Sequence, residues 1–268
     1  MLEISSTQNP KVKRVVKLRN RRDRDQEGVF LIEGYRELLR AVDAGIAVQE
    51  LFICKELFLG ENEDALIQKA LSAGAELYHC NKMVFEKLSY RDRPDGLLAV
   101  APQSMKTLSD LELGTPPFLL VGEAIEKPGN LGTMLRSSDA AGVDGLIICD
   151  RCTDIHNPNV VRASVGTLFT VPVVEADGKE TLEWLRAKGI QILAATPHAE
   201  KLYTEVDLTG PVAIAVGTEQ LGLSPLWMEA ADIQVRIPMR GTADSLNVAT
   251  ATTLLLYEVL RQRENSGC

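Results

Sequence analysis

The segment at residues 118–136 reads FLLVGEAIEKPGNLGTMLR and indicates the fold class of the second half of the chain. It opens with a short continuous apolar run up to Gly122, which is typical of a strand buried on both faces of a parallel sheet. A helix is predicted next, at residues 131–141, with Asn130 suited to its N-cap. Gly132 and Arg136 are four residues apart and therefore share one face of that helix. A buried strand that leads directly into a helix favours an α/β fold.

The same alternation continues on both sides of this segment. Further strands are predicted at residues 145–149, 171–174, 190–195, 212–217 and 234–237, and further helices at residues 160–168, 180–188 and 248–263. Short apolar strands separated by helices predict a parallel sheet covered on both faces. A basic helix at residues 9–22 opens a smaller α/β module. We therefore expect an N-terminal domain at residues 1–103, a proline-rich linker at 104–117 and a second domain at 118–268.

Two more polar segments follow predicted strands, where ligands of open parallel sheets bind. After residues 212–216 comes GTEQLGLSP (217–225), a glycine-bracketed loop that carries the carboxylate of Glu219. After residues 234–237 comes PMRGTADSLN (238–247), which precedes a long helix. Ser245 and Asn247 are both cap formers, so one of them is surplus if capping is the only task. Taken singly, each segment is also explained by turn and cap chemistry.

Composition excludes several classes of protein. The chain has 268 residues, 45% hydrophobic and 25% charged, which is ordinary for a globular protein and excludes wholesale disorder and a fibre. It has no apolar run of the ~18 residues that a membrane helix needs, and no hydrophobic signal core at the start. The 5 cysteines, an odd number, favour a reducing compartment. We expect a cytoplasmic protein without a membrane partner.

The net charge of −8 hides an uneven distribution. Residues 1–40 hold ten Lys/Arg and six Asp/Glu, a balance of +4, which leaves −12 on the remainder. A basic arm on an acidic body is typical of proteins that hold phosphates locally, although a solvated helical face explains the charges equally well. The candidate RNA-binding residues of this basic arm are Lys11, Lys13, Arg14, Lys17, Arg21 and Arg22.

Together, the three segments at 130–136, 217–224 and 237–249 resemble, in order and spacing, the three motifs of the SpoU/TrmH family. These are RNA ribose 2′-O-methyltransferases of the SPOUT class. Residues 157–166, NPNVVRASVG, resemble the family's segment between its first two motifs. Residues 30–34 and the helix after them resemble the ribosomal-protein-like substrate-binding domain that many members carry.

The resemblance implies a fold, a donor and a site. The fold would be a SPOUT-type parallel sheet with a deep trefoil knot, in a homodimer formed through the C-terminal domain. S-adenosylmethionine would be the methyl donor, with no metal, and its binding residues would be Thr196, Gly217, Ile237 and Leu246. The catalytic set would be Arg136, Asn130, Glu219, Ser245 and Asn247, acting on RNA rather than DNA. An arginine keeps its proton in proteins, so Arg136 as a base and Arg136 as an electrostatic group both stay open.

Other functions compete with this one. Ribosomal RNA is favoured as substrate on account of the front domain, with transfer RNA as the alternative. A catalytically silent RNA-binding protein is another alternative, which the full motif set disfavours. A nucleotide-dependent oxidoreductase would need a glycine fingerprint that the first strand lacks. Cys149 and Cys152 form a Cys-x-x-Cys pair, but a zinc site would need a second pair and a redox motif a helix at this point, so two loop thiols are favoured.

Overall fold

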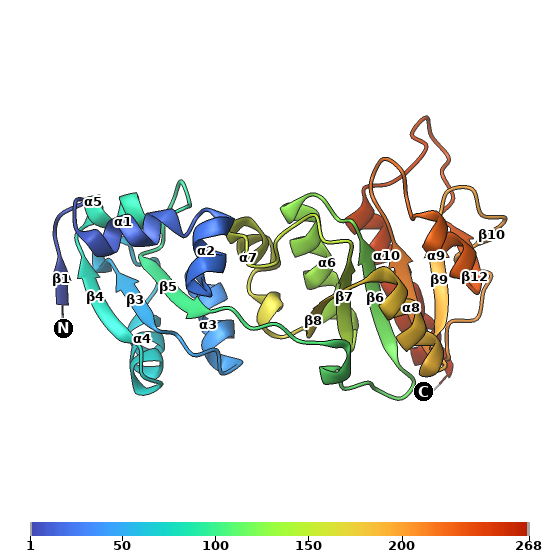
Figure 1. Cartoon of the computed structure of the whole chain (residues 1–268), viewed down its shortest axis with the longest axis horizontal. Coiled ribbons are helices and arrows are strands. Elements are labelled where there is room, and N and C mark those ends of the chain that lie inside the picture. Colours follow the sequence, from blue (N-terminus) through green and yellow to red (C-terminus); the bar gives the residue numbers. More distant parts are fainter. Residues whose placement is uncertain (1, 267–268) are drawn as a thin grey trace. The chain divides into compact units, whose positions relative to one another are not determined.

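The computed structural model describes residues 2–266 and divides the chain into two compact units (Figure 1). The N-terminal unit extends to Ser104 and also contains Asp154–Thr170. The C-terminal unit contains Met105–Thr153 and the chain from Val171 onward. This division differs from the predicted domain bounds, because Asp154–Thr170 lies within the predicted second domain. Its Val161 is buried in the same apolar cluster as Ile32 and Leu38 of the N-terminal unit.

The N-terminal unit is built on a five-stranded mixed sheet of order β1-β4-β3-β5-β2. Strand β5 is antiparallel to β2 and β3, whereas β4 is parallel to β3 and β1. The helices and strands of this unit are β1 (Leu2–Ile4), α1 (Pro10–Lys17), α2 (Arg21–Glu27), β2 (Val29–Glu33), α3 (Tyr35–Asp43), β3 (Glu50–Ile53), the 3₁₀ turn η1 (Lys55–Leu57), α4 (Glu63–Ser72), β4 (Glu76–Cys80), α5 (Lys82–Leu88), β5 (Leu97–Pro102), α7 (Pro158–Ser164) and the 3₁₀ turn η3 (Thr167–Phe169).

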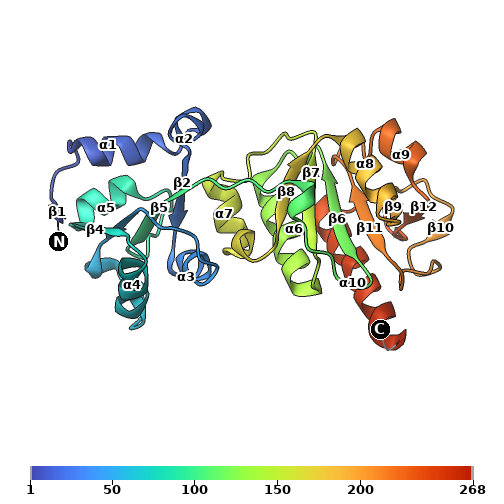
Figure 2. The same cartoon turned by 60° about the horizontal axis from the view of Figure 1, so that its bottom comes forward.

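Apolar residues pack on both faces of this sheet. On one face, α1 and α5 supply Val12, Val15 and Phe85 to a cluster with Phe52 of β3. On the other face, α3 and α4 pack with η3 and α7; Figure 2 shows the two layers of helices on opposite sides of the strands. His156, which comes just before α7, is buried with its ring 4.7 Å from that of Phe30. The segment 154–170 is thus part of this unit's core.

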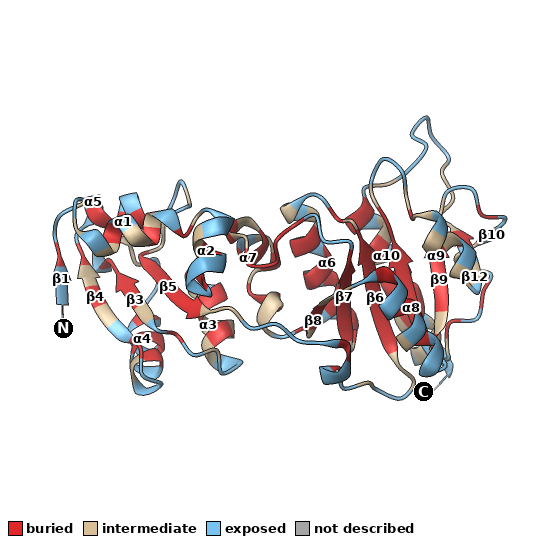
Figure 3. Cartoon of the chain, in the orientation of Figure 1, coloured by how far each residue is buried: buried red, intermediate tan, exposed pale blue. Residues whose placement is uncertain are grey.

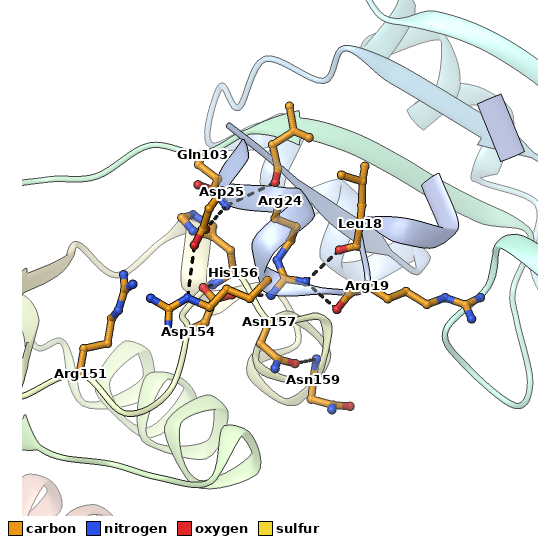
Figure 4. A network of polar contacts seen from close by, with 12 residues as sticks. Leu18, Arg19, Arg24, Asp25, Gln103, Arg151, Asp154, His156, Asn157 and Asn159 are labelled. Carbon is orange, nitrogen blue, oxygen red and sulfur yellow. Dashed lines mark hydrogen bonds and ion pairs between the residues drawn. The ribbon is translucent and has the colours of Figure 1, made fainter. Parts of the chain in front are cut away.

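The basic helix predicted at residues 9–22 is two helices, α1 and α2, which was not foreseen. The break is stabilised by Arg24, whose Nη1 donates hydrogen bonds of 2.8 Å to the carbonyls of Leu18 and Arg19 (Figure 4). Its Nη2 forms an ion pair with Asp154. The Arg24 side chain is only 1% exposed. One cation of the basic arm is therefore a structural group.

The C-terminal unit contains a seven-stranded sheet of order β10-β12-β9-β11-β6-β7-β8, and every pairing in it is parallel. This confirms the predicted parallel sheet. Its elements are the 3₁₀ turn η2 (Leu108–Asp110), β6 (Phe118–Glu123), α6 (Pro128–Ala141), β7 (Gly145–Cys149), β8 (Val173–Ala176), α8 (Gly178–Ala187), β9 (Gln191–Ala195), β10 (Lys201–Leu202), β11 (Val212–Val216), α9 (Pro225–Ala230), β12 (Ile233–Arg236) and α10 (Val248–Ser266).

Helices cover both faces of this sheet. Leu185 of α8 and Trp227 of α9 are buried with Val121 and Ile147 on one face, and α6 and α10 pack together on the other. The central strands are accordingly buried throughout (Figure 3). Because all strands are parallel, their carboxyl ends lie at one edge, as the pairing of Ala195 with Val235 illustrates. That edge is where ligands of such sheets bind.

The stretch predicted as a linker, residues 104–117, is packed against the C-terminal unit. Leu108 and Leu111 are buried in its core, and Thr107 and Asp110 cap the short turn between them. In the described residues, no helix combines the length and the apolar character needed to cross a membrane. The trefoil knot stays a prediction.

Candidate active site at the carboxyl edge of the C-terminal sheet

Three side chains from three distant segments meet at this edge. The Asn130 amide donates to the carboxylate of Glu219. The Asn247 amide donates to Glu219 Oε1 at 2.9 Å and to Asn130 Oδ1 at 3.1 Å. Lys127 forms an ion pair with the second oxygen of Glu219. We call Asn130, Glu219, Asn247 and Lys127 the motif cluster.

Local structure explains how each member reaches the motif cluster. The N-cap of α6 is Lys127 and Pro128 occupies the first turn, so Asn130 lies inside the helix and is not its cap, contrary to expectation. Asn247 keeps the cap role: its Oδ1 accepts the Ala249 N–H at 3.0 Å, which leaves its amide N–H₂ free to donate. One asparagine therefore begins α10 and joins it to the other two segments.

Glu219 is presented by a closed turn. Thr218 and Gly222 exchange two backbone hydrogen bonds, of 3.0 and 3.1 Å. Gly222 has a φ of +68°, and a Cβ atom at Gly217 would overlap the Gly222 carbonyl, so both glycines are required. Leu221, at the tip, is 89% exposed. Hydrogen bonds from Lys127 and then Asn130 lower the pKa of the Glu219 carboxyl, which therefore stays ionised at neutral pH.

The other two residues of the expected catalytic set lie outside the motif cluster. Arg136 is exposed on α6, six residues from Asn130, which on an α-helix is about 9 Å along the axis and ~120° around it. Ser137 beside it hydrogen-bonds Thr253 of α10 at 2.7 Å, so this part of α6 is held against α10. Ser245 is exposed in the segment before α10.

The expected donor-binding residues follow three adjacent strands. Thr196, Gly217 and Ile237 come directly after β9, β11 and β12, which are neighbours in the sheet. Leu246, like Ile237, is half-buried and offers apolar surface. The Ser224 hydroxyl, at the end of the Glu219 turn, is buried without a hydrogen-bond partner among the described residues. Apolar side chains, strand-end backbone and one unsatisfied hydroxyl suit a ligand that has a flat base and a polar chain.

A small cavity that opens to solvent adjoins the motif cluster. Its lining includes Asn130, Gly217 and Glu219, with Ile125 and Val248 as apolar walls. It therefore lies between the first and second motifs, on the helix α6 side of the Glu219 turn. The sequence predicted Asn130 and Glu219 of this cavity but not Lys127, whose position before Pro128 was its only signal.

Some cations of the basic arm form ion pairs within the N-terminal unit and others do not. Lys11 lies 2.5 Å from Glu50, and Arg14 lies 2.7 Å from Glu27 and 2.5 Å from Glu50. Arg21 pairs with Asp25 at 3.3 Å. The exposed side chains without an ion pair in the described chain are Lys13, Lys17 and Arg22. Half of the predicted RNA-binding cations thus already have carboxylate partners within the N-terminal unit.

The two cysteines of the Cys-x-x-Cys pair lie in different environments. Cys149 is buried at the end of β7, its thiol lies 3.4 Å from the Thr181 hydroxyl, and burial raises its pKa to about 12. Cys152 is exposed. A thiol with that pKa stays protonated at neutral pH, so Cys149 is neither a nucleophile nor a ready metal ligand.

Comparison with known proteins agrees with this geometry. Residues 117–257 match the SpoU rRNA Methylase family, and residues 9–99 match the MRM3-like substrate binding domain. The chain is 29% identical over 259 residues to the 23S rRNA (guanosine(2553)-2′-O)-methyltransferase RlmP of Bacillus subtilis, covering 97% of this chain and 99% of RlmP.

Two solved structures are similar over nearly the whole chain. One is a crystal structure of an RNA 2′-O ribose methyltransferase, 42% identical with a TM-score of 0.86, which covers 98% of this chain and 100% of that one. Another is the AdoMet-bound rRNA methyltransferase of Sinorhizobium meliloti, 30% identical with a TM-score of 0.89, which covers 97% of both chains. With its three motifs meeting at one edge of a parallel sheet, the chain belongs to the SpoU rRNA methylase family of RNA 2′-O-methyltransferases.

Proposed function

We propose that the protein transfers a methyl group from S-adenosylmethionine to a ribose 2′-hydroxyl of ribosomal RNA. The observation that carries the proposal is the motif cluster, in which Asn130, Glu219 and Asn247 from three separate segments hydrogen-bond one another. The preference for ribosomal over transfer RNA is supported by the substrate-binding domain match and by the 23S rRNA specificity in the name of RlmP.

The residues would divide the work as follows. S-adenosylmethionine, when bound near Thr196, Gly217, Ile237 and Leu246, supplies an activated methyl group. Glu219 and Asn247 hold the Gly217–Leu223 turn and the start of α10 in one arrangement, which fixes the geometry of attack. Arg136, whose guanidinium stays protonated, holds a phosphate or lowers the pKa of the attacking hydroxyl electrostatically, and water takes the proton.

The basic arm would contact the phosphates of the RNA. We assign this role first to Lys13, Lys17 and Arg22, which are exposed and unpaired in the described chain. Lys11, Arg14 and Arg21 would have to exchange carboxylates for phosphates, so their contribution to binding should be smaller. A homodimer through the C-terminal domain and a cytoplasmic location stay predictions.

The activity is tested by incubating the full chain with labelled S-adenosylmethionine and unmodified ribosomal or transfer RNA transcripts. We expect label in ribosomal RNA, recovered in dinucleotides that resist alkaline cleavage because a methylated 2′-oxygen cannot attack the adjoining phosphate. Label in transfer RNA alone would reassign the substrate. A chain that binds S-adenosylmethionine but labels neither naked RNA nor ribosomal particles, or that does not bind the donor, would contradict the proposal.

Glu219→Ala should lower kcat/KM for methyl transfer by about 10–100-fold, because three hydrogen bonds or ion pairs to one carboxylate are lost. Glu219→Gln retains one oxygen that can accept from both asparagines and should lose less. The lowered pKa of Glu219 sets the direction of the pH effect: the ionised form, and the activity that depends on it, persist at neutral pH and are lost as pH falls through that pKa. Gln220→Ala, an exposed neighbour in the same turn, is the control.

A further inference from the structure

A second cavity lies in the N-terminal unit, apart from the residues of the motif cluster. It is a shallow hollow that opens to solvent. Its lining residues come from β2, from the turn after α5 and from α7: Leu31, Glu33, Tyr90, Arg91, Pro158 and Arg162. We call it the Tyr90 cavity. None of these residues belongs to the expected catalytic, donor-binding or basic-arm sets, although Pro158 and Arg162 lie in the 157–166 segment that resembles the family.

The turn that carries Tyr90 is fixed by buried polar contacts. The Glu33 carboxylate accepts the Ser89 hydroxyl at 2.5 Å and the Tyr90 N–H at 2.7 Å. Arg91 donates to the Glu33 carbonyl at 2.5 Å and to Glu37 at 2.6 Å. Arg19 donates to the Ser89 carbonyl at 2.6 Å. Because these contacts order the turn before any ligand binds, binding would not have to pay the entropy of fixing it.

The Tyr90 ring stays accessible in this fixed turn. The side chain is 39% exposed, and its hydroxyl accepts a hydrogen bond of 3.0 Å from the Asn159 amide. The hydroxyl therefore keeps its own proton to donate. Tyr90 is therefore held at its backbone N–H and at its hydroxyl while more than a third of the residue stays exposed.

One cation in the lining of the Tyr90 cavity has no carboxylate partner in the described chain. The one carboxylate in its lining, Glu33, is engaged by Ser89 and Tyr90. Arg162 is exposed at the end of α7 and has no ion pair within the described chain. Arg91, by contrast, is paired with Glu37 at 2.6 Å and with Asp95 at 4.0 Å. The cavity therefore combines the exposed Tyr90, a buried apolar floor at Leu31 and Pro158, and the unpaired cation of Arg162.

We infer that the Tyr90 cavity binds one unpaired nucleotide of the RNA substrate, with its base stacked on Tyr90 and its phosphate held by Arg162. A single-stranded base can leave its stack and lie on an aromatic ring, whereas a paired base cannot. An acidic peptide would use Arg162 but leave the ring without a partner. The inference rests on the proposed function only in taking RNA as the substrate.

The test measures affinity directly, by fluorescence anisotropy of a labelled eight-residue oligouridylate with the full chain. Tyr90→Ala should weaken binding by about 5–150-fold, since stacking contributes ~1–3 kcal/mol per base, while Tyr90→Phe should stay within about twofold. Arg162→Ala should weaken binding and reduce the slope of log K against log salt by about 0.7, the value for one phosphate of a single strand. Met83→Ala, an exposed apolar residue of α5, is the matched control.

The experiments distinguish a failure of the Tyr90 inference from a failure of the methyltransferase proposal. Equal affinity of wild type and both Ala variants for the oligouridylate, or no binding by the wild type, overturns the inference even if ribosomal RNA is methylated. Tyr90-dependent binding without methyl transfer supports the inference and counts against the enzyme. Arg162→Ala, at an exposed side chain, keeps the test decisive if Tyr90→Ala fails to fold.

Discussion

Arg136→Ala is expected to lower kcat/KM for methyl transfer by about 10²–10⁴-fold, the range that a group assisting proton transfer contributes. A ribose hydroxyl is a weak nucleophile, so a fixed positive charge that favours its ionisation acts mainly in the transition state. Within residues 2–266 the Arg136 guanidinium has no hydrogen-bond or ion-pair partner, so the fold does not depend on it. The measurement is single-turnover methylation of ribosomal RNA, with thermal unfolding in parallel.

Two variants make the result specific. Arg186→Ala removes an exposed arginine from α8 of the same unit and should leave the rate unchanged. Arg136→Lys keeps the charge but loses the planar fork. If the charge alone acts, Lys should restore at least tenfold of the lost rate; if bidentate phosphate contact is needed, it should restore little. A wild-type rate in Arg136→Ala would remove Arg136 from the reaction.

The fold of the C-terminal unit follows closely from sequence, because its signal is local. Apolar runs such as Val212–Val216 are buried on both faces, and that pattern predicts a parallel strand without knowledge of its neighbours. The sequence did not predict the very short strand β10, which has only two residues, Lys201 and Leu202, at the edge of the sheet. In the front unit, the break between α1 and α2 depends on Arg24, whose partner Asp154 is 130 residues away.

The grouping of the three polar segments could be predicted from one rule of parallel sheets. Parallel strands end at one edge, so polar loops after β6, β11 and β12 had to come close together, and Asn130, Glu219 and Asn247 do. The sequence could not predict which cations of the basic arm lack an ion pair, because the pairs of Lys11 and Arg14 with Glu50 join residues far apart in sequence. The Tyr90 cavity was missed for the same reason: its two halves are brought together only by the fold.

Asp154→Asn should destabilise the N-terminal unit by about 3–5 kcal/mol, because it leaves the Arg24 guanidinium buried without a counter-charge. The two side chains, drawn in Figure 4, form an ion pair. They are 1% and 8% exposed, so water cannot compensate. For a unit of this size the midpoint of its thermal transition should fall by roughly 10–20 °C. Asp154 also accepts the His156 N–H at 2.9 Å, so the same change loosens the start of the 154–170 segment. Scanning calorimetry of the full chain resolves the transition.

The control is Asp25→Asn in the adjacent α2, whose pair with Arg21 is 45% and 50% exposed and should be worth less than about 1 kcal/mol. Equal midpoints for the two Asn variants would contradict the prediction. Replacing both charges, in Arg24→Met with Asp154→Leu, should recover most of the stability, since apolar pairs often substitute for buried ion pairs. If that double variant stays as unstable as Asp154→Asn, the loss comes instead from the uncapped carbonyls of Leu18 and Arg19, and Arg24 acts mainly as the connector of α1 and α2.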